Sequence, residues 1–475
     1  ACFIESLYNW SIWNKIYESG LCKKAYESAG DFYCNMAEDV YTYFIISYFS
    51  KSYIGIAGDP LYNYYYGLGM TGGITNNGLT KMSMLCEQYR IAQELRKFLC
   101  QQNASIKYFD VVNSLEKKFF DECMWYWFNI LSNVDCAAGF DILIGHWGSE
   151  RVIAFLAKNY LNKQEVISQK VLNSSSLKTK KETIKKIGVF YHRMRNGGVE
   201  RVISLLAPIW IGLGYDVVFF TDEEPTESDF SLPSCVDRVV LPTSIDIHPD
   251  ETYKRIAVLR ESIIKNDIDV FIHNASSSPM LIFDLLVIKT MGIPTIVSSH
   301  ETFSSSMYWR DMGTLKKIHV YKIADLVIVL TKVDFKFWTL FGINTVCIPN
   351  PLLADINNIP QSKLDLLNVI WVGRFSIEKR YIHAVQIFAE VVREIPEAKL
   401  LMLGKGESTA QTDELKYEIE RLGLTEHVVL CGYFKDITHF YSMSSVYLTT
   451  SYHESFSMAL IESRAYGIPS VAYEL

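Results

Sequence analysis

The second half of the chain alternates short apolar runs with helix-like segments, and this alternation constrains the fold more than any other feature. Beyond Lys186 the apolar runs are Ile187–Tyr191, Val217–Thr221, Val270–His273, Thr295–Ser298, Leu326–Leu330, Val346–Ile348, Val369–Val372, Leu400–Leu403, Val428–Leu430 and Ser445–Thr449. Continuous apolar strands separated by helices predict parallel sheets that are covered on both faces. The pattern restarts after Asn350-Pro351, which predicts an α/β fold of two doubly wound, Rossmann-like domains. A ligand is expected in the cleft at the carboxyl ends of the strands.

Composition narrows the class of protein and the type of partner. A chain of 475 residues is long enough for two to four domains. Lys plus Arg number 46 against 53 Asp plus Glu, a net charge of -7, so we expect no nucleic acid partner. The ten cysteines are scattered without a Cys-x-x-Cys pair, which indicates reduced thiols and a cytoplasmic location. No apolar run reaches the roughly 18–20 residues of a transmembrane helix, so we expect at most peripheral association with the inner face of a membrane.

The chain before Lys186 has a different character. Residues 1–77 are rich in aromatic side chains, and residues 78–162 are predicted to form a helical connector, with one amphipathic helix from Met82 to Phe98. Residues 163–186 are rich in Lys and Ser and are predicted to be a linker. Two further domains then cover residues 187–350 and 351–475. Because the chain lacks an initial Met and stops just after an apolar run, we expect it to be a fragment of a longer polypeptide.

A glycine pair follows the first apolar run. Gly197-Gly198 stands directly before a predicted helix, where the backbone can approach an anion and the helix N-terminus favours negative charge. A tight turn without a ligand would explain the same pair.

Two cations follow the first strand of the last domain. Arg374 lies just past the strand Val369–Val372, and Lys379 follows five residues later, so both can point into the cleft. Two fixed cations suit a diphosphate, because they offset the charge that develops on a departing phosphate oxygen. Pairing of Arg374 with a surface carboxylate is the alternative.

Two glutamates near the end of the chain stand eight residues apart. On one helix, Glu454 and Glu462 would lie about 12 Å apart along the axis. The N–H groups of Phe456, Ser457 and Met458 between them would form a helix N-terminus that can bind a diphosphate. Solvated helices often carry two glutamates at this spacing, so the spacing alone does not identify a site.

Taken together, residues 187–475 resemble the family-4 glycosyltransferases of the GT-B fold. The resemblance rests on Gly197-Gly198-Val199-Glu200-Arg201, Ile348-Pro349-Asn350-Pro351, Val372-Gly373-Arg374 with Lys379, Leu403-Gly404-Lys405-Gly406 and the glutamate pair, in family order. It implies that Arg374 and Lys379 hold the donor diphosphate, that Glu462 binds the ribose and that Glu454 lies by the donor sugar. It also implies that His300 lines the sugar and acceptor side of the cleft.

The same resemblance implies the reaction. It predicts retaining transfer from a nucleotide-sugar donor to a glycan or lipid-linked acceptor, in cell-surface polysaccharide or glycoconjugate synthesis, with no metal cofactor for this module. Ser455 and Ser457 stand where the family usually has glycine, and the family's closing helix is absent. The serines still offer backbone N–H groups to a phosphate.

The N-terminal segment resembles the second half of a family-2 glycosyltransferase of the GT-A fold. Trp13-Asn14-Lys15, Met36-Ala37-Glu38-Asp39 and Asp59-Pro60-Leu61-Tyr62 carry this resemblance. It implies that Asp39 is the base that deprotonates the acceptor hydroxyl, and that the chain is part of a bifunctional enzyme. The divalent-metal site (Mg or Mn) of such a module would precede Ala1. An ordinary helix start, where the helix dipole favours acidic residues, also explains Glu38-Asp39. Asp267-Ile268-Asp269 matches the Asp-x-Asp pattern of a metal site but is expected to be a capped loop.

Two other function classes remain open at this point. A sugar-nucleotide epimerase shares the GT-B fold and would alter a nucleotide sugar without an acceptor. A non-catalytic scaffold that binds a glycan or a nucleotide would not lose partner binding when Glu462 or Lys379 is replaced.

Overall fold

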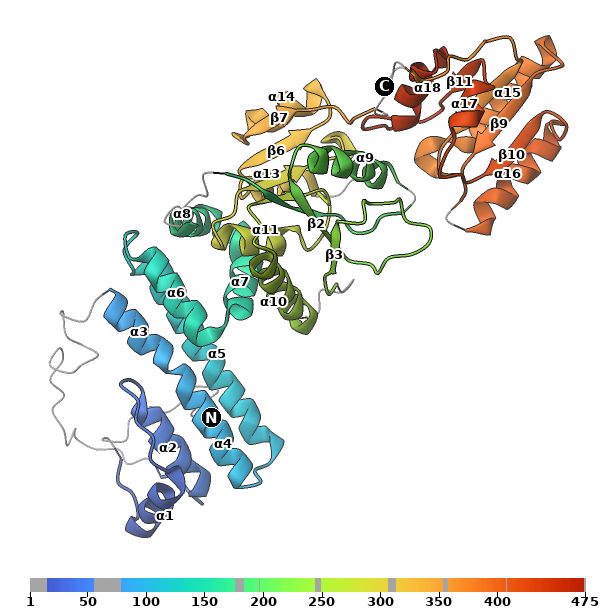
Figure 1. Ribbon diagram of the computed structural model, residues 1–475. Coiled ribbons are helices and arrows are strands. Elements are labelled where there is room, and N and C mark those ends of the chain that lie inside the picture. Colours follow the sequence, from blue (N-terminus) through green and yellow to red (C-terminus); the bar gives the residue numbers. More distant parts are fainter. Residues whose placement is uncertain are drawn as a thin grey trace. The chain divides into compact units, whose positions relative to one another are not determined.

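The computed structural model describes residues 15–54, 78–175, 183–195, 197–243, 249–305, 313–352, 358–406 and 408–473 (Figure 1). The chain forms two compact units. Unit 1 comprises Ala1–Lys180, Ser244–Arg260 and Leu286–Ile293, and unit 2 comprises Lys181–Thr243, Glu261–Leu285 and Pro294–Leu475. The two later segments of unit 1 have no counterpart among the predicted domains, because contacts between distant segments leave no local pattern.

Unit 1 is helical in its described part. The helices of its first segment are α1 (Ser19–Ala29), α2 (Glu38–Phe49), α3 (Leu79–Glu87), α4 (Tyr89–Gln101), α5 (Ile106–Asn129), α6 (Cys136–Trp147), α7 (Ser149–Asn159), η1 (Tyr160–Asn162) and α8 (Gln164–Ser175). Its two later segments contribute parts of α10 (Pro249–Asn266) and α11 (Leu281–Thr290). Figure 1 shows α4 continuing from the end of α3; α5 packs against both of these helices, and α6 packs against α3. The single helix expected from Met82 to Phe98 is divided at Gln88, whose side chain is buried.

The predicted linker differs from the structure over much of its length. Residues 164–175 form α8, which packs against α6. The Lys170 ammonium is buried and donates hydrogen bonds to the backbone oxygens of Trp127 and Leu131, the latter at 3.0 Å. These carbonyls lie at the C-terminal end of α5, where a lysine satisfies backbone acceptors that the helix leaves unpaired. The lysine-rich composition indicated a solvated spacer. Composition alone does not show that one of these lysines is buried.

The first sheet of unit 2 is parallel and follows the predicted strands. Within the described residues it has the order β3-β2-β1-β4-β5-β6-β7. Its strands are β1 (Lys186–Phe190), β2 (Asp216–Thr221), β3 (Asp237–Val240), β4 (Val270–His273), β5 (Thr295–Ser298), β6 (Leu326–Val329) and β7 (Thr345–Cys347), and the intervening helices are α9 (Gly198–Gly212), α10 (Pro249–Asn266), α11 (Leu281–Thr290), α13 (Gly313–Tyr321) and α14 (Lys332–Leu340). The sequence missed β3, an edge strand that is only half-buried and begins with the charged pair Asp237-Arg238.

The second sheet of unit 2 is also parallel, with the order β10-β9-β8-β11-β12 among the described residues. Its elements are β8 (Asn368–Val372), η3 (Ile377–Lys379), α15 (Tyr381–Glu394), β9 (Lys399–Leu403), α16 (Thr409–Arg421), β10 (Val428–Gly432), α17 (Thr438–Ser442), β11 (Val446–Leu448), α18 (Met458–Ala465) and β12 (Ser470–Val471). Phe388 of α15, Leu415 of α16 and the inward-facing Leu400 and Met402 of β9 form one buried core. Two sheets of this kind confirm the predicted pair of Rossmann-like domains.

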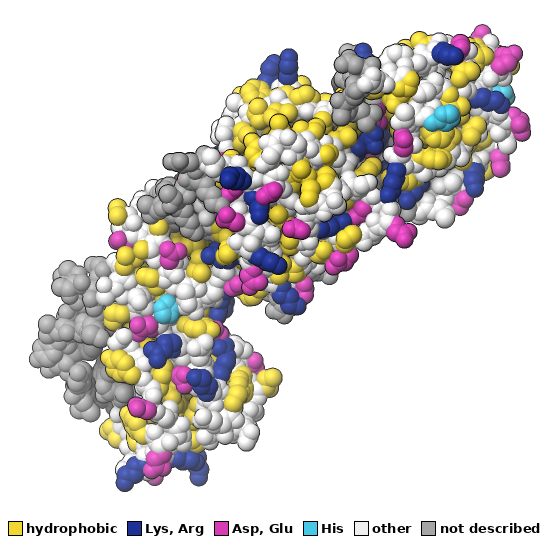
Figure 2. Space-filling model, viewed as in Figure 1, with side chains coloured by type: hydrophobic (Ala, Val, Ile, Leu, Met, Phe, Trp, Pro, Cys, Tyr) yellow, Lys and Arg dark blue, Asp and Glu magenta, His cyan; other side chains and the backbone are white. Residues whose placement is uncertain are grey.

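The described helices contain no segment that is long and apolar enough to cross a membrane. Basic and acidic side chains are interspersed over the face shown in Figure 2.

Candidate active site

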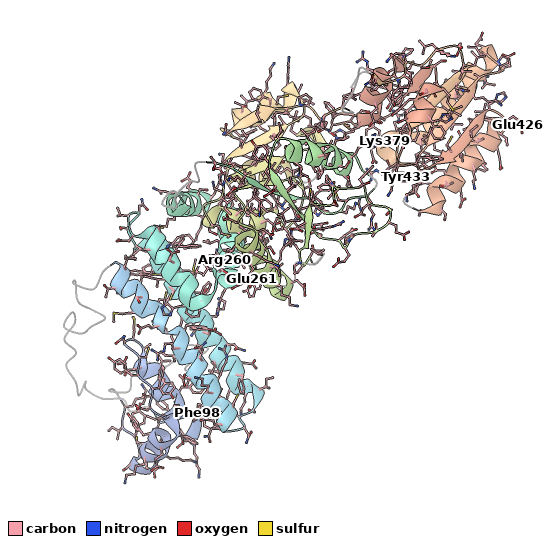
Figure 3. The ribbon with its side chains drawn as sticks, viewed as in Figure 1. Phe98, Arg260, Glu261, Lys379, Glu426 and Tyr433 are labelled. Carbon is pink, nitrogen blue, oxygen red and sulfur yellow. The ribbon has the colours of Figure 1, made fainter. Side chains whose placement is uncertain are left out.

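The order of the second sheet locates the candidate site. From β8 the chain proceeds to β9 and β10 on one side of the sheet and returns to β11 and β12 on the other. Ligands of doubly wound sheets bind at such a reversal, beyond the carboxyl ends of the two strands. The loops that follow β8 and β11 therefore border the expected crevice. In Figure 3, Lys379 and Tyr433, which follow β8 and β10, lie at one edge of this domain, and Glu426, which precedes β10, lies at the opposite edge.

Lys379 and Glu454 connect these two loops. The Lys379 ammonium forms an ion pair with the Glu454 carboxylate, which also accepts a 2.8 Å hydrogen bond from the Ser451 hydroxyl. Both charged side chains are largely shielded from solvent. The structure therefore brings together two residues that the sequence analysis assigned separately to the diphosphate and to the donor sugar.

Further hydrogen bonds, most of them to backbone atoms, connect the same two loops. The Thr450 hydroxyl contacts the carbonyl oxygens of Lys379 and Arg380 at 2.9 and 3.1 Å, and the indole N–H of Trp371 donates to Thr450 Oγ1 at 3.1 Å. The backbone N–H of Tyr452 donates to the carbonyl oxygen of Glu378 at 3.1 Å. Thr450 is fully buried, so it holds the Lys379 backbone in place independently of the Lys379 side chain.

Arg374 is the more exposed of the two predicted cations. Its guanidinium lies 3.2 Å from Glu378 Oε1, and 54% of its side chain is accessible to solvent. This is the carboxylate pairing that the sequence analysis gave as the alternative for Arg374. Exposed pairs contribute at most about 1 kcal/mol, so a phosphate can replace Glu378 at little cost.

Glu454 does not lie on the same helix as Glu462, contrary to the expectation from their spacing. Helix α18 begins at Met458, and Glu454 precedes it in the loop after β11. The N-cap residue of α18 is Ser457, which has φ 53° and makes no side-chain capping bond. This left-handed conformation is the one that glycine adopts most easily, which accounts for the glycine that the family usually has here. Phe456 and Met458, on either side of Ser457, are partly buried.

Glu462 is buried, with 3% of its surface exposed, and its carboxylate already has two partners. Arg201 Nε lies 2.7 Å from Oε1, and the Tyr441 hydroxyl lies 3.3 Å from Oε2. A carboxylate has about four lone-pair positions, so two remain for a vicinal diol such as that of ribose.

The glycine pair is close to the start of α18. A side chain at Gly198, the first residue of α9, would come within 3.8 Å of Met458 Cγ. A side chain at Gly197 would overlap the carboxylate of Glu200, with its nearest oxygen only 2.1 Å away. A side chain at Gly197 would therefore have to displace the Glu200 carboxylate, whose pKa is raised by burial. Both the tight-turn and the anion-binding interpretations of the pair remain compatible with this geometry.

His300 lies two residues beyond the end of β5. Its Nε2 is 3.3 Å from Asn274 Oδ1 and 3.2 Å from Ser298 Oγ. Burial lowers the pKa of His300 to about 4, so the imidazole is neutral at physiological pH.

Asp39 lies in unit 1, in the first turn of α2. Burial and the neighbouring Glu38 raise the pKa of its carboxyl group.

Asp269 Oδ2 accepts hydrogen bonds from the backbone N–H groups of Lys185 and Lys186, both at 2.8 Å, so Asp267-Ile268-Asp269 is a capped loop as expected. In the part of the chain that the structure describes, no group of three or more His, Cys, Asp or Glu side chains is arranged to hold a metal ion.

Comparison with known proteins identifies the class of enzyme. The family model described as glycosyltransferase family 4 matches residues 196–352, and the model described as glycosyl transferases group 1 matches residues 355–474. Together the two matches span more than half of the chain. Residues 196–474 therefore form a GT-B glycosyltransferase module. Neither match reaches the first 195 residues.

Individual relatives agree with this assignment. The glycosyltransferase is 25% identical over 297 residues to an uncharacterized glycosyltransferase of Haemophilus influenzae, a match that covers 61% of this chain and 81% of that protein. It is 26% identical over 293 residues to the amylovoran biosynthesis glycosyltransferase AmsD of Erwinia amylovora, covering 59% and 78%. The crystal structure of the pneumococcal O-GlcNAc transferase GtfA, in complex with UDP and GlcNAc, matches with a TM-score of 0.51 at 14% identity, covering 62% and 85%, and shows the same fold. The protein is thus an enzyme of sugar transfer, and these relatives do not favour the epimerase or the scaffold.

Sequence reasoning missed three residues of this glycosyltransferase site. Arg201 was quoted within a motif but was given no partner, because its contact with Glu462 joins residues 261 positions apart. Asn274 directly follows β4 and Thr450 lies two residues beyond β11, and this position at a strand carboxyl end is the signal that could have identified them.

Proposed function

We propose that residues 187–475 transfer a sugar from a nucleotide-sugar donor to a glycan or lipid-linked acceptor, with retention of anomeric configuration. The observation that carries the proposal is the contact between Lys379 and Glu454 at the reversal between β8 and β11. It joins Lys379, a candidate cation for binding the diphosphate, to Glu454, a candidate carboxylate for binding the donor sugar. The two loops that hold them are fixed by Thr450.

The proposed chemistry relies on charges that are already in place. As the bond between the sugar and the diphosphate breaks, negative charge accumulates on the departing phosphate oxygen. Lys379, Arg374 and the N-terminus of α18, which includes the N–H groups of Phe456, Ser457 and Met458, would stabilise that charge. Glu462 would bind the ribose, and Gly197-Gly198 would let the first domain approach the phosphates. This module would then need no metal ion.

The experiment that tests this proposal is a donor screen. The protein is incubated with UDP-, GDP- and CDP-sugars, and hydrolysis or transfer is measured for the wild type and for Lys379→Gln and Glu462→Gln. Loss of turnover in both variants supports the proposal. The control is Lys399→Gln, since Lys399 contacts the backbone of Glu426 at the opposite edge of the same domain. A wild type that neither binds nor consumes any nucleotide sugar overturns the proposal.

The biosynthetic process and the cellular location of the reaction are part of the same proposal. One relative is named for amylovoran biosynthesis, which supports a role in polysaccharide or glycoconjugate synthesis. Nine cysteines of the described part are free thiols, in keeping with a reducing cytoplasm. A lipid-linked acceptor would then place the enzyme at the inner face of the membrane. Specificity for the donor sugar and the acceptor would lie in the loops around residues 304–309 and 451–453, of which residues 306–309 are outside the described part.

A second function is proposed for residues 1–77. The raised pKa of Asp39 suits a general base, because a carboxylate with a raised pKa takes up a proton more readily. In a bifunctional parent, Asp39 would deprotonate the acceptor hydroxyl of a GT-A module that uses Mg or Mn. Replacement of Asp39 by Asn should abolish one chelator-sensitive transfer and leave the other unchanged. Equal effects on both transfers, or on neither, contradict this assignment.

A further inference from the structure

The carboxyl ends of three adjacent strands bring one asparagine and one histidine together. Strands β1, β4 and β5 are neighbours in the first sheet, and Phe190, Asn274 and His300 lie at or just beyond their carboxyl ends. The reversal of this sheet lies between β1 and β4, so these residues border its crevice. Asn274 is 7% exposed, so its amide group has few partners other than protein atoms.

The orientation of the Asn274 amide follows from its contact with the backbone. Asn274 Nδ2 lies 3.2 Å from the carbonyl oxygen of Phe190, which also accepts the Asn274 backbone N–H at 2.9 Å. A carbonyl oxygen can only accept hydrogen bonds, so the amide nitrogen must face it. The amide oxygen, Oδ1, must therefore face His300 Nε2, 3.3 Å away.

The tautomer of His300 follows from the orientation of the amide. Because Oδ1 can only accept, Nε2 of His300 must carry the proton, and Ser298 Oγ at 3.2 Å can accept from the same N–H. In a neutral imidazole the other nitrogen, Nδ1, then has a lone pair. Nδ1 is buried, and none of the residues that the structure describes forms a hydrogen bond with it.

We propose that Asn274 is a positioning residue that fixes His300 as the Nε2–H tautomer, so that Nδ1 accepts a hydrogen bond from a sugar hydroxyl of the bound substrate. The inference rests on the proposed function of residues 187–475. A hydroxyl is the complementary group, because Nδ1 is a buried acceptor without a hydrogen-bond partner among the described residues and a sugar hydroxyl can donate to it. Such a contact would discriminate against substrates that lack this hydroxyl.

The lowered pKa of His300 supports this role and provides the test. With a pKa of about 4, wild-type His300 stays neutral, so kcat/KM should not depend on its protonation between about pH 5.5 and 8.5. In Asn274→Asp the introduced carboxylate favours imidazolium and raises the pKa of His300. Protonation fills the Nδ1 lone pair, so activity should be lost as the pH falls through the raised pKa.

The kinetic experiment compares two substitutions at one position. Asn274→Asp keeps an acceptor for His300 Nε2 but loses the donor to the Phe190 carbonyl oxygen, so we expect a reduced kcat/KM near pH 8 and a further fall of about tenfold per pH unit below the raised pKa. For Asn274→Leu, which cannot fix either tautomer, we expect a loss of about tenfold that does not vary with pH. Equal losses in both variants at every pH indicate a purely structural role and overturn the proposal.

A measurement on the wild-type protein tests the tautomer of His300 directly, so this test remains valid even when a variant misfolds. In the nitrogen-15 NMR spectrum of histidine-labelled protein, the signals that disappear in His300→Gln identify His300. The chemical shifts of its two nitrogens show which one carries the proton. Protonated Nε2 is expected, and protonated Nδ1 overturns the inference. A wild type that is inactive with all donors contradicts the proposed function, whereas the NMR result still decides the tautomer.

Discussion

Arg201 Nε lies 2.7 Å from Glu462 Oε1, and this ion pair joins α9 of the first sheet domain to α18 of the second. Only 5% of the Glu462 side chain and 23% of the Arg201 side chain are exposed. A buried carboxylate depends on such a partner, because removal of one member leaves an uncompensated charge. Glu462, which is proposed to bind the ribose, is therefore held by Arg201 from the other sheet domain.

Arg201→Gln should raise the KM for the nucleotide-sugar donor by at least about tenfold, since Glu462 loses the contact that orients its carboxylate. Steady-state kinetics and nucleotide binding measure the effect. The matched control is Arg151→Gln, which removes a guanidinium of similar exposure from its ion pair with Glu116 in unit 1. A donor KM that stays at the wild-type value in Arg201→Gln would show that Arg201 does not position Glu462.

Lys379→Gln should lower kcat by about 10²–10³, the usual cost of losing one group that stabilises developing charge. The fold should be little affected, because Thr450 holds the Lys379 backbone and Ser451 still donates to Glu454. Single-turnover measurements at saturating donor separate this loss from weaker binding. If only KM changes, Lys379 binds the ground state and not the transition state.

Substitutions at Ser457 should reveal the strain of its positive φ. Ser457→Gly should increase the free energy of unfolding by up to about 1 kcal/mol, after allowance for the greater freedom of glycine in the unfolded chain. Ser457→Val should decrease it by about 2 kcal/mol, because a β-branched residue fits this conformation poorly. Urea denaturation followed by tryptophan fluorescence gives both values. A more stable Val variant would contradict the left-handed conformation.

Excess EDTA should leave donor turnover by residues 187–475 unchanged. Arg374, Lys379 and the N-terminus of α18 supply positive charge at the proposed diphosphate position, which is the role that a divalent ion would otherwise have. The assay measures nucleotide release before and after chelation and after addition of Mg or Mn. Loss of turnover that the metal restores would show that these groups are insufficient.

Lys170→Met should destabilise unit 1 by about 1–3 kcal/mol, because the carbonyl groups of Trp127 and Leu131 would be buried without a donor. Thermal unfolding monitored by circular dichroism measures the change. Lys158→Met, which alters a lysine in the last turn of the neighbouring helix α7, is the control and should change stability by less than about 0.5 kcal/mol. Equal stability of the two variants would contradict the structural role of Lys170.

The sequence by itself determined the architecture of residues 187–475 and the identity of most candidate site residues. Buried parallel strands must be apolar along their whole length, and residues at their carboxyl ends share one edge of a sheet, so Arg374 and Lys379 could be named from position, whereas His300 was assigned only through the family resemblance. Strand β3 was not predicted because this half-buried edge strand begins with the charged pair Asp237-Arg238.

Only the tertiary structure decided which charges meet and which helices bury their polar residues. Glu454 lies in a loop and pairs with Lys379, whereas Glu462 is buried against Arg201, although the sequence spacing suggested one helix that carries both carboxylates. Lys170, interpreted from composition as part of a solvated spacer, is buried against the end of α5. The physical reason is that ion pairs and hydrogen bonds depend on distances in space, and residues far apart in the sequence carry no local signal of their contact.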